Sequence, residues 1–358
     1  MNSMKAFIKQ TASELFPGCF AMVMATGALS IAAEVLGIGW IATSLLVFNI
    51  VVYPLLWLLT LIRLIGYFPL LAADFANHAK GPGFFTLIAG TCMLGSQWII
   101  VTGNAYLAFW LWVVGLVLWL AIMYSFFTIV TVRKATPTLE MGINGAWLLA
   151  VVAVQSLSIL GSLLAETLET GKQLMLFLTL SFHLLGCMLY IILITLIFYR
   201  FIFLRMEHAE LTPPYWINMG AVAISTMAGC TLLLHGASWQ LIDTIRPFLT
   251  GFTLFFWVFG TWWTPLLLIL FIWRHLYHRY PLSYEPQQWG MVFPLAMYTI
   301  STFYLATVLH LDFLFFIPEV MVYVAMTAWL TVTMGLLRHV VKKYRTYEAD
   351  GKQTQLYR

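Results

Sequence analysis

The stretch GWIATSLLVFNIVVYPLLWLLTLI, residues 39–62, contains no charged side chain. A bilayer core about 30 Å thick is crossed by roughly 20 apolar residues in an α-helix, so this run is long enough to span it. Lipid offers no hydrogen-bond partners, and a helix satisfies all of its backbone groups internally. The run therefore predicts a transmembrane helix.

Runs of this kind fill the chain. Of its 358 residues, 62% are hydrophobic and only 9% are charged, whereas a soluble domain is about a quarter charged. The connections between these apolar runs are too short to form a separate soluble domain. We predict ten transmembrane helices, at Pro17–Leu36, Gly39–Ile62, Phe84–Gly103, Tyr106–Val130, Ala146–Ala165, Leu174–Tyr199, Tyr215–Leu234, Pro247–Ile272, Trp289–Leu309 and Phe313–Leu337.

The predicted fold is all-α and integral to the membrane, with a single transmembrane domain over residues 1–358. It divides into an N-terminal segment at 1–15, a ten-helix domain at 17–337 and a basic tail at 338–358. This composition excludes a nucleic-acid-binding surface as the main role of the basic residues. We expect the lipid bilayer to be the principal partner.

The basic residues predict the orientation, because Lys and Arg gather in cytoplasmic segments. Only Lys172 and Arg246 lie on one side of the predicted topology. We therefore expect both termini in the cytoplasm, in a multi-pass protein of the cell (inner or plasma) membrane. The sixteen basic residues on the other side are Lys5, Lys9, Arg63, Lys80, Arg133, Lys134, Arg200, Arg205, Arg274, Arg279, Arg338, Lys342, Lys343, Arg345, Lys352 and Arg358.

The odd-numbered helices begin alike, with Pro, Gly or Asn followed by an aromatic residue, roughly every 60 to 75 residues. This repetition predicts five helical hairpins. The interiors of the odd helices carry small, hydroxyl and amide residues, which either permit close helix packing or line a water-filled path. On the second interpretation, the candidate lining residues are Phe20, Thr26, Gly27, Thr91, Gln97, Gln155, Ser156, Ser225, Thr226, Ser301 and Thr302.

Two segments carry a family resemblance. FPGCFAMVMATG, residues 16–27, resembles the opening signature of the tellurite-resistance and C4-dicarboxylate transporter family, which includes the plant slow-type (voltage-dependent) anion channels. WGMVFP, residues 289–294, is similar to the family segment in which a phenylalanine before a proline plugs the pore. Ala25 stands where dicarboxylate transporters of the family often have glycine, so the resemblance does not identify the anion.

The resemblance implies a quasi-five-fold arrangement with the odd helices inside, around a central anion pore, and commonly a homotrimer. It assigns the gate to Phe293, with Pro294 as the kink beside it. The implied function is the movement of small inorganic or organic anions, as a channel or transporter and not as an enzyme. It requires no cofactor and no metal.

The charge pattern agrees with a path for anions. No Lys or Arg lies inside a predicted span, so attraction would come from the helix N-termini and the basic cytoplasmic side. A negative cell interior would then favour outward flux of anions.

Two other classes stay open. A proton-coupled carrier of C4-dicarboxylates such as malate would use His183 or Glu319 as its titrating group, and these two residues could pair. Efflux of sulfite or tellurite is a further alternative to this carrier. A membrane redox enzyme could hold haem between His183 and His235.

Overall fold

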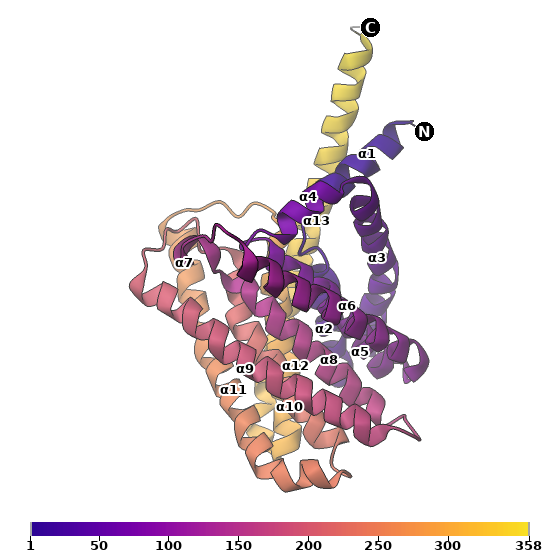
Figure 1. The fold of residues 1–358 in the computed structure, drawn as a ribbon, viewed down its shortest axis with the longest axis vertical. Coiled ribbons are helices and arrows are strands. Elements are labelled where there is room, and N and C mark those ends of the chain that lie inside the picture. Colours follow the sequence, from indigo (N-terminus) through magenta and orange to yellow (C-terminus); the bar gives the residue numbers. More distant parts are fainter. Residues whose placement is uncertain (1, 357–358) are drawn as a thin grey trace.

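The computed structural model describes the backbone of residues 2–356 and the side chains of residues 6–347. Arg358 therefore lies outside the described residues, as do the side chains of Lys5 and Lys352. Figure 1 shows a helical bundle with both termini at one end, which we call the terminal face. The last helix continues beyond the bundle on this face.

Five inner helices form a closed ring. They are α2 (Ala21–Val35), α5 (Phe85–Thr102), α8 (Leu149–Ala165), α10 (Ile217–His235) and α12 (Trp289–Leu309). Each packs against the next in this order, and α12 packs against α2. The ring confirms the predicted quasi-five-fold arrangement, with the odd-numbered predicted helices inside.

Each inner helix is followed by a longer outer helix. These are α3 (Gly39–Gly66), α6 (Ala105–Val132), α9 (Lys172–Phe203), α11 (Gln240–Ile272) and α13 (Phe316–Leu356). Every outer helix packs on its own inner helix and also on the next inner helix around the ring. The chain is therefore five hairpins, each with its outer helix in the groove between two inner ones.

Side-chain size explains which helices lie inside. All residues of α8 are buried, and glycines let the outer helices approach the inner ones closely. A Cβ added at Gly229 of α10 would lie 2.1 Å from Oγ1 of Thr253 on α11. The outer helices expose large apolar side chains, such as Val51 on α3 and Val117 on α6. Such extended apolar surfaces indicate contact with lipid.

The first expected span differs from the others. Nine helices within residues 2–356 are long and apolar enough to cross a membrane, whereas α2 has only 15 residues, or about 22 Å. Residues 17–20 form a hydrogen-bonded turn instead of helix, in which the amide of Cys19 donates to the carbonyl of Phe16. Pro17 and Gly18 favour this turn over a regular helix.

The remaining inner helices begin with short 3₁₀ turns, namely η1 (Gly81–Phe84), η2 (Gly145–Leu148), η3 (Pro213–Trp216) and η5 (Pro286–Gln288). Outside the ring lie α1 (Asn2–Ser13), which packs on α3 and α13, and the short helices α4 (Phe68–Phe75) and α7 (Leu139–Gly142). A π-helical turn, η4 (Trp273–Tyr277), extends α11, and η6 (Asp312–Leu314) precedes α13.

Arginines at the ends of four outer helices tie each hairpin back to its own beginning. Each donates from its guanidinium to a backbone carbonyl just before the inner helix of the same hairpin. The pairs are Arg63 with Leu15, Arg133 with Ala76, Arg200 with Ile143, and Arg274 with Leu211. We call these four contacts the arginine clasps.

Three of the clasp arginines are buried, and each has a second partner. Arg63 pairs with Asp74 at 2.6 Å, Arg200 lies 3.5 Å from Glu210, and the Arg274 guanidinium lies 4.1 Å from the Tyr280 ring centre. Buried guanidinium groups need such partners because an uncompensated buried charge is costly. The clasps hold the beginnings of the inner helices in place on the terminal face.

Candidate functional site: the axial cavity

The five inner helices begin around one cavity of about 290 Å³, which we call the axial cavity. Its lining repeats at steps of three residues, which matches the 3₁₀ and hydrogen-bonded turns at these helix starts. One residue from each hairpin lies three positions further along the chain than a lining residue of the turn. These five residues surround the cavity, and we call them the five-residue ring. These residues are Ala21, Thr86, Leu149, Ile217 and Gly290.

Polar residues line the outer part of the axial cavity. Lys80, Asn144 and Thr212 directly precede their turns, Gln287 lies within η5, and Phe16 lies just before the turn of the first hairpin. Lys80 carries the single ionisable side chain among the described residues that line this cavity.

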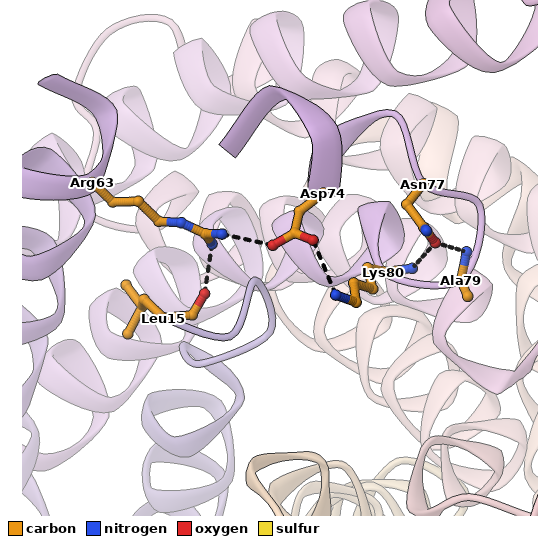
Figure 2. A network of polar contacts seen from close by, with 6 residues as sticks. All are labelled: Leu15, Arg63, Asp74, Asn77, Ala79 and Lys80. Carbon is orange, nitrogen blue, oxygen red and sulfur yellow. Dashed lines mark hydrogen bonds and ion pairs between the residues drawn. The ribbon is translucent and has the colours of Figure 1, made fainter. Parts of the chain in front are cut away.

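Lys80 belongs to a polar network that Figure 2 shows. Its ammonium lies 3.2 Å from Oδ1 of Asp74, whose Oδ2 lies 2.6 Å from the guanidinium of Arg63. The backbone amides of Ala79 and Lys80 donate to Oδ1 of Asn77 at 2.9 and 3.1 Å. Asn77 thereby forms a side-chain-capped turn after α4, which sets the position of Lys80. The network joins α3, α4 and the cavity lining.

Met24 and Phe293 line the cavity one step of three residues beyond Ala21 and Gly290. Phe293 is only 1% exposed. Pro294 follows it in α12 and packs against α10, since a Cβ at Gly220 would lie 2.7 Å from Cγ of Pro294. Pro294 has no amide to donate to the carbonyl of Gly290, so the helix ladder is interrupted beside the cavity.

None of the predicted lining residues is among the described residues that line the axial cavity. Phe20 packs edge-on against Tyr53 and Trp57 of α3. Gly27 lies against Met93 and Gln97. The hydroxyls of four others donate to carbonyls of their own helices, namely Ser156, Ser225, Thr226 and Ser301.

The other predicted lining residues bond to neighbouring helices. Gln97 accepts from Asn49 of α3 at 2.8 Å, and Gln155 donates to Ser225 of α10 at 3.1 Å. The hydroxyls of Thr26, Thr91 and Thr302 bond to aromatic side chains of outer helices. In this conformation these polar groups therefore join helices to one another.

An aromatic residue on each outer helix bonds to the next inner helix around the ring. The ring nitrogen of Trp329 donates to Thr26, that of Trp257 donates to Thr302, and that of Trp112 donates to the carbonyl of Leu157. Tyr53 shares a hydrogen bond with Thr91, and Tyr190 donates to the carbonyl of Asn218. These five contacts were not predicted, although an aromatic residue inside each outer helix is visible in the sequence.

The structure does not bring His183 and Glu319 together. His183 is fully buried on α9, where Nδ1 lies 3.1 Å from Oε1 of Gln155, whereas Glu319 is exposed on α13. His235, at the end of α10, has a different partner, with Nδ1 2.9 Å from Oε1 of Glu166. The two histidines thus have separate surroundings and do not form one site.

Sequence comparisons cover the whole bundle. Residues 14–337 match the sequence model of a family described as voltage-dependent anion channel, SLAC1. An uncharacterized transporter of Methanocaldococcus jannaschii is 27% identical over 308 residues, which are 84% of this chain and 86% of that protein. An uncharacterized membrane protein of Mycobacterium tuberculosis is 36% identical over 152 residues, which are 42% of this chain and 77% of that protein. The axial cavity lies within the matched region.

Proposed function

Since the chain belongs to the voltage-dependent anion channel family, SLAC1, we propose that it moves small anions across the membrane along the axis of its inner ring. The observation that carries this proposal is the axial cavity. Residues from the beginnings of all five inner helices line it, so it lies on the axis of the ring. The one ionisable residue among its described lining residues, Lys80, is basic, which suits an anion.

The inner helices begin at this cavity, so each directs its N-terminus toward it. A helix N-terminus is equivalent to about half a positive charge and favours anions. From the five-residue ring inward the described lining is apolar except for Thr86, and it ends at Met24 and Phe293. Such a lining can pass an anion without holding it tightly, as conduction requires.

We propose Phe293 as the gate, with Pro294 holding it in place. Its side chain is buried at the inner end of the cavity, which is what a closed gate requires. Pro294 interrupts the helix ladder next to it, and such a position tolerates local movement of the backbone. The structure would then represent a closed conformation.

The Phe293→Ala variant tests the gate. Removing the phenyl ring should raise anion flux into proteoliposomes about tenfold or more. A tenfold rate corresponds to a free-energy barrier to permeation that is lower by about 1.4 kcal/mol. Phe177→Ala is the matched control, because Phe177 is exposed on the outer helix α9. It should leave the flux unchanged. Equal flux in wild type and Phe293→Ala would remove Phe293 as the gate.

We also propose that the terminal face is cytoplasmic, on the bias of basic residues, and that the chain forms a homotrimer in the cell membrane. A negative interior then drives anions outward by about 2.3 kcal/mol per charge per 100 mV. Native mass spectrometry from detergent tests the oligomer, for which we expect three chains per particle.

A further inference from the structure

Lys80 is the one charged residue among the described residues that line the axial cavity. It is also the one ionisable residue of this described lining, whose other outer residues include Phe16, Asn144, Thr212 and Gln287. Any attraction of anions by a charged side chain within this cavity must therefore come from Lys80. The lining of the cavity is therefore electrically asymmetric, with a single cationic side chain among its described residues.

Asp74 does not cancel this charge, because Asp74 is shared. Its Oδ2 lies 2.6 Å from Arg63, whereas its Oδ1 lies 3.2 Å from Lys80. The Arg63 side chain is 5% exposed and the Lys80 side chain is 57% exposed. The carboxylate is thus mainly the counter-ion of the buried guanidinium, since ion pairs are strongest where water is excluded. The three groups together carry one net positive charge, and its most exposed part is the Lys80 ammonium.

The network also fixes where the ammonium lies. Lysine has a flexible stem and loses much side-chain entropy when held in one place. Here Asn77 orders the backbone of Ala79 and Lys80 from one side. Asp74 holds the ammonium from the other side. Because Arg63 also clasps the carbonyl of Leu15, the position of Lys80 is tied to the first hairpin.

We propose that Lys80 is the anion-capturing residue of the axial cavity, and that Asp74 is the positioning residue that holds it there. A captured anion would receive one charged donor from Lys80 and neutral polar contacts from Asn144, Thr212 and Gln287, which line the same part of the cavity. This inference rests on the proposed function. To the proposed anion path it assigns one residue, Lys80, that sets the affinity for anions entering from the terminal face.

The test is the concentration of anion that gives half-maximal current from the terminal face, measured in planar bilayers with chloride and, separately, nitrate as probes. The measurement uses the Phe293→Ala background, in which the proposed gate is removed and the current should be larger. Lys80→Gln should raise the half-saturating concentration about fivefold at low salt, as expected for one unit charge about 4 Å from the anion in water. The difference should shrink as the ionic strength rises. Lys172→Gln, on the opposite side of the predicted topology, is the control and should have no effect from the terminal face.

A cysteine variant separates charge from folding. Lys80→Cys is made with Cys19→Ser, because Cys92, Cys187 and Cys230 are buried and Cys19 is partly accessible. A thiol reagent carrying an ammonium should restore the low half-saturating concentration, and one carrying a sulfonate should raise it further. Asp74→Asn should raise the half-saturating concentration less than Lys80→Gln does, because the charge remains but is no longer held.

The outcomes separate the two proposals. If neither wild type nor Phe293→Ala carries chloride or nitrate, the proposed function fails and this inference fails with it. A second outcome is anion current with the same half-saturating concentration in the protein with Lys80, in Lys80→Gln and in both reagent-modified forms of Lys80→Cys. In that case Lys80 does not capture anions, and the proposed function stands.

Discussion

His183 is buried in the middle of an outer helix, where an ionisable residue raises the suspicion of proton coupling. The structure gives it a neutral partner. Oε1 of Gln155 accepts from Nδ1 of His183, and Nε2 of Gln155 donates to the carbonyl of His183 and to the hydroxyl of Ser225. Gln155 thus joins α8, α9 and α10, and His183 is its partner on α9.

We predict that His183→Gln keeps anion flux within about a factor of two of wild type, because its contacts are structural. The measurement is flux into proteoliposomes with and without a pH gradient. Glu319→Gln serves as the companion variant, since Glu319 is exposed on α13. Flux that requires a proton gradient in wild type and loses this requirement in either variant would support the proton-coupled carrier instead.

The residues predicted to line the path were chosen in two ways, by motif and by side-chain type, and the structure places the two groups differently. Phe293 was found because a motif carries it, and it does line the axial cavity. Thr26, Gln97 and Thr302 were chosen by residue type, and their hydroxyl and amide groups bond to outer helices. Composition indicates that an inner helix holds polar groups, but the rotation of the helix decides where they point.

Among elements, the arginine clasps connect the ends of four of the five outer helices to the beginnings of their hairpins. Arg200 has the most partners, since it donates to the carbonyl of Ile143 and, at 2.7 Å, to the hydroxyl of Tyr215. The sequence counted Arg200 only toward the orientation. Its clasp could not be predicted, because the carbonyl that it reaches lies 57 residues earlier in the chain.

We predict that Arg200→Ala lowers the stability of the protein by about 2–3 kcal/mol, because hydrogen bonds to charged groups contribute about that much and their buried partners lose them. Thermal unfolding in detergent measures this loss. Arg205→Ala is the control on the same connection, since the Arg205 side chain is 86% exposed. It should leave the unfolding temperature nearly unchanged. A similar loss in both variants would contradict a specific role for the clasp.

The first and last helices form a second contact between elements. Lys343 of α13 donates to Glu14, just after α1, at 2.7 Å, and Phe7 of α1 packs edge-on against Tyr344 and Tyr347. The hydrogen bond from Lys343, followed by one from Gln10, lowers the pKa of Glu14 below its ordinary value of 4.5. Because the pKa is lower in the paired state, the pair stabilises the contact above pH 4.5. That contribution is lost as the pH falls through the lowered pKa.

We predict that the contact between α1 and α13 weakens on acidification below pH 4.5, and that Glu14→Gln removes this pH dependence. The pair is exposed, so its contribution is small, about 0.2–1 kcal/mol, and screened by salt. Distances between spin labels on α1 and α13, measured across this pH range, report the separation. A pH dependence equal in wild type and Glu14→Gln would exclude Glu14 as its source.

On the scale of the whole molecule, the hairpin repeat in the sequence and the family resemblance together predicted the closed ring of five inner helices. The repeat at the helix starts gave the order of the hairpins, and the family resemblance placed the odd helices inside. Packing of α12 against α2 closes the ring. The shortness of α2 was missed, since its apolar run is long but Pro17 and Gly18 open it with a turn.

The axial cavity could be located only in part. The sequence identified the repeated helix starts that line it, and counted Lys80 among sixteen basic residues without distinguishing it. What singles out Lys80 is the turn at Asn77 together with the shared carboxylate of Asp74. These depend on how α4 lies against α3, which apolar periodicity does not determine.

The central claim is that the anion path runs through the middle of the inner ring. Its most direct test is thiol block of the five-residue ring, with cysteine introduced singly at Ala21, Thr86, Leu149, Ile217 and Gly290 in the Cys19→Ser, Phe293→Ala background. A charged thiol reagent added at the terminal face should reduce anion current at all five positions, because each faces the same cavity. Block at only one or two positions, or at none, would contradict a central path.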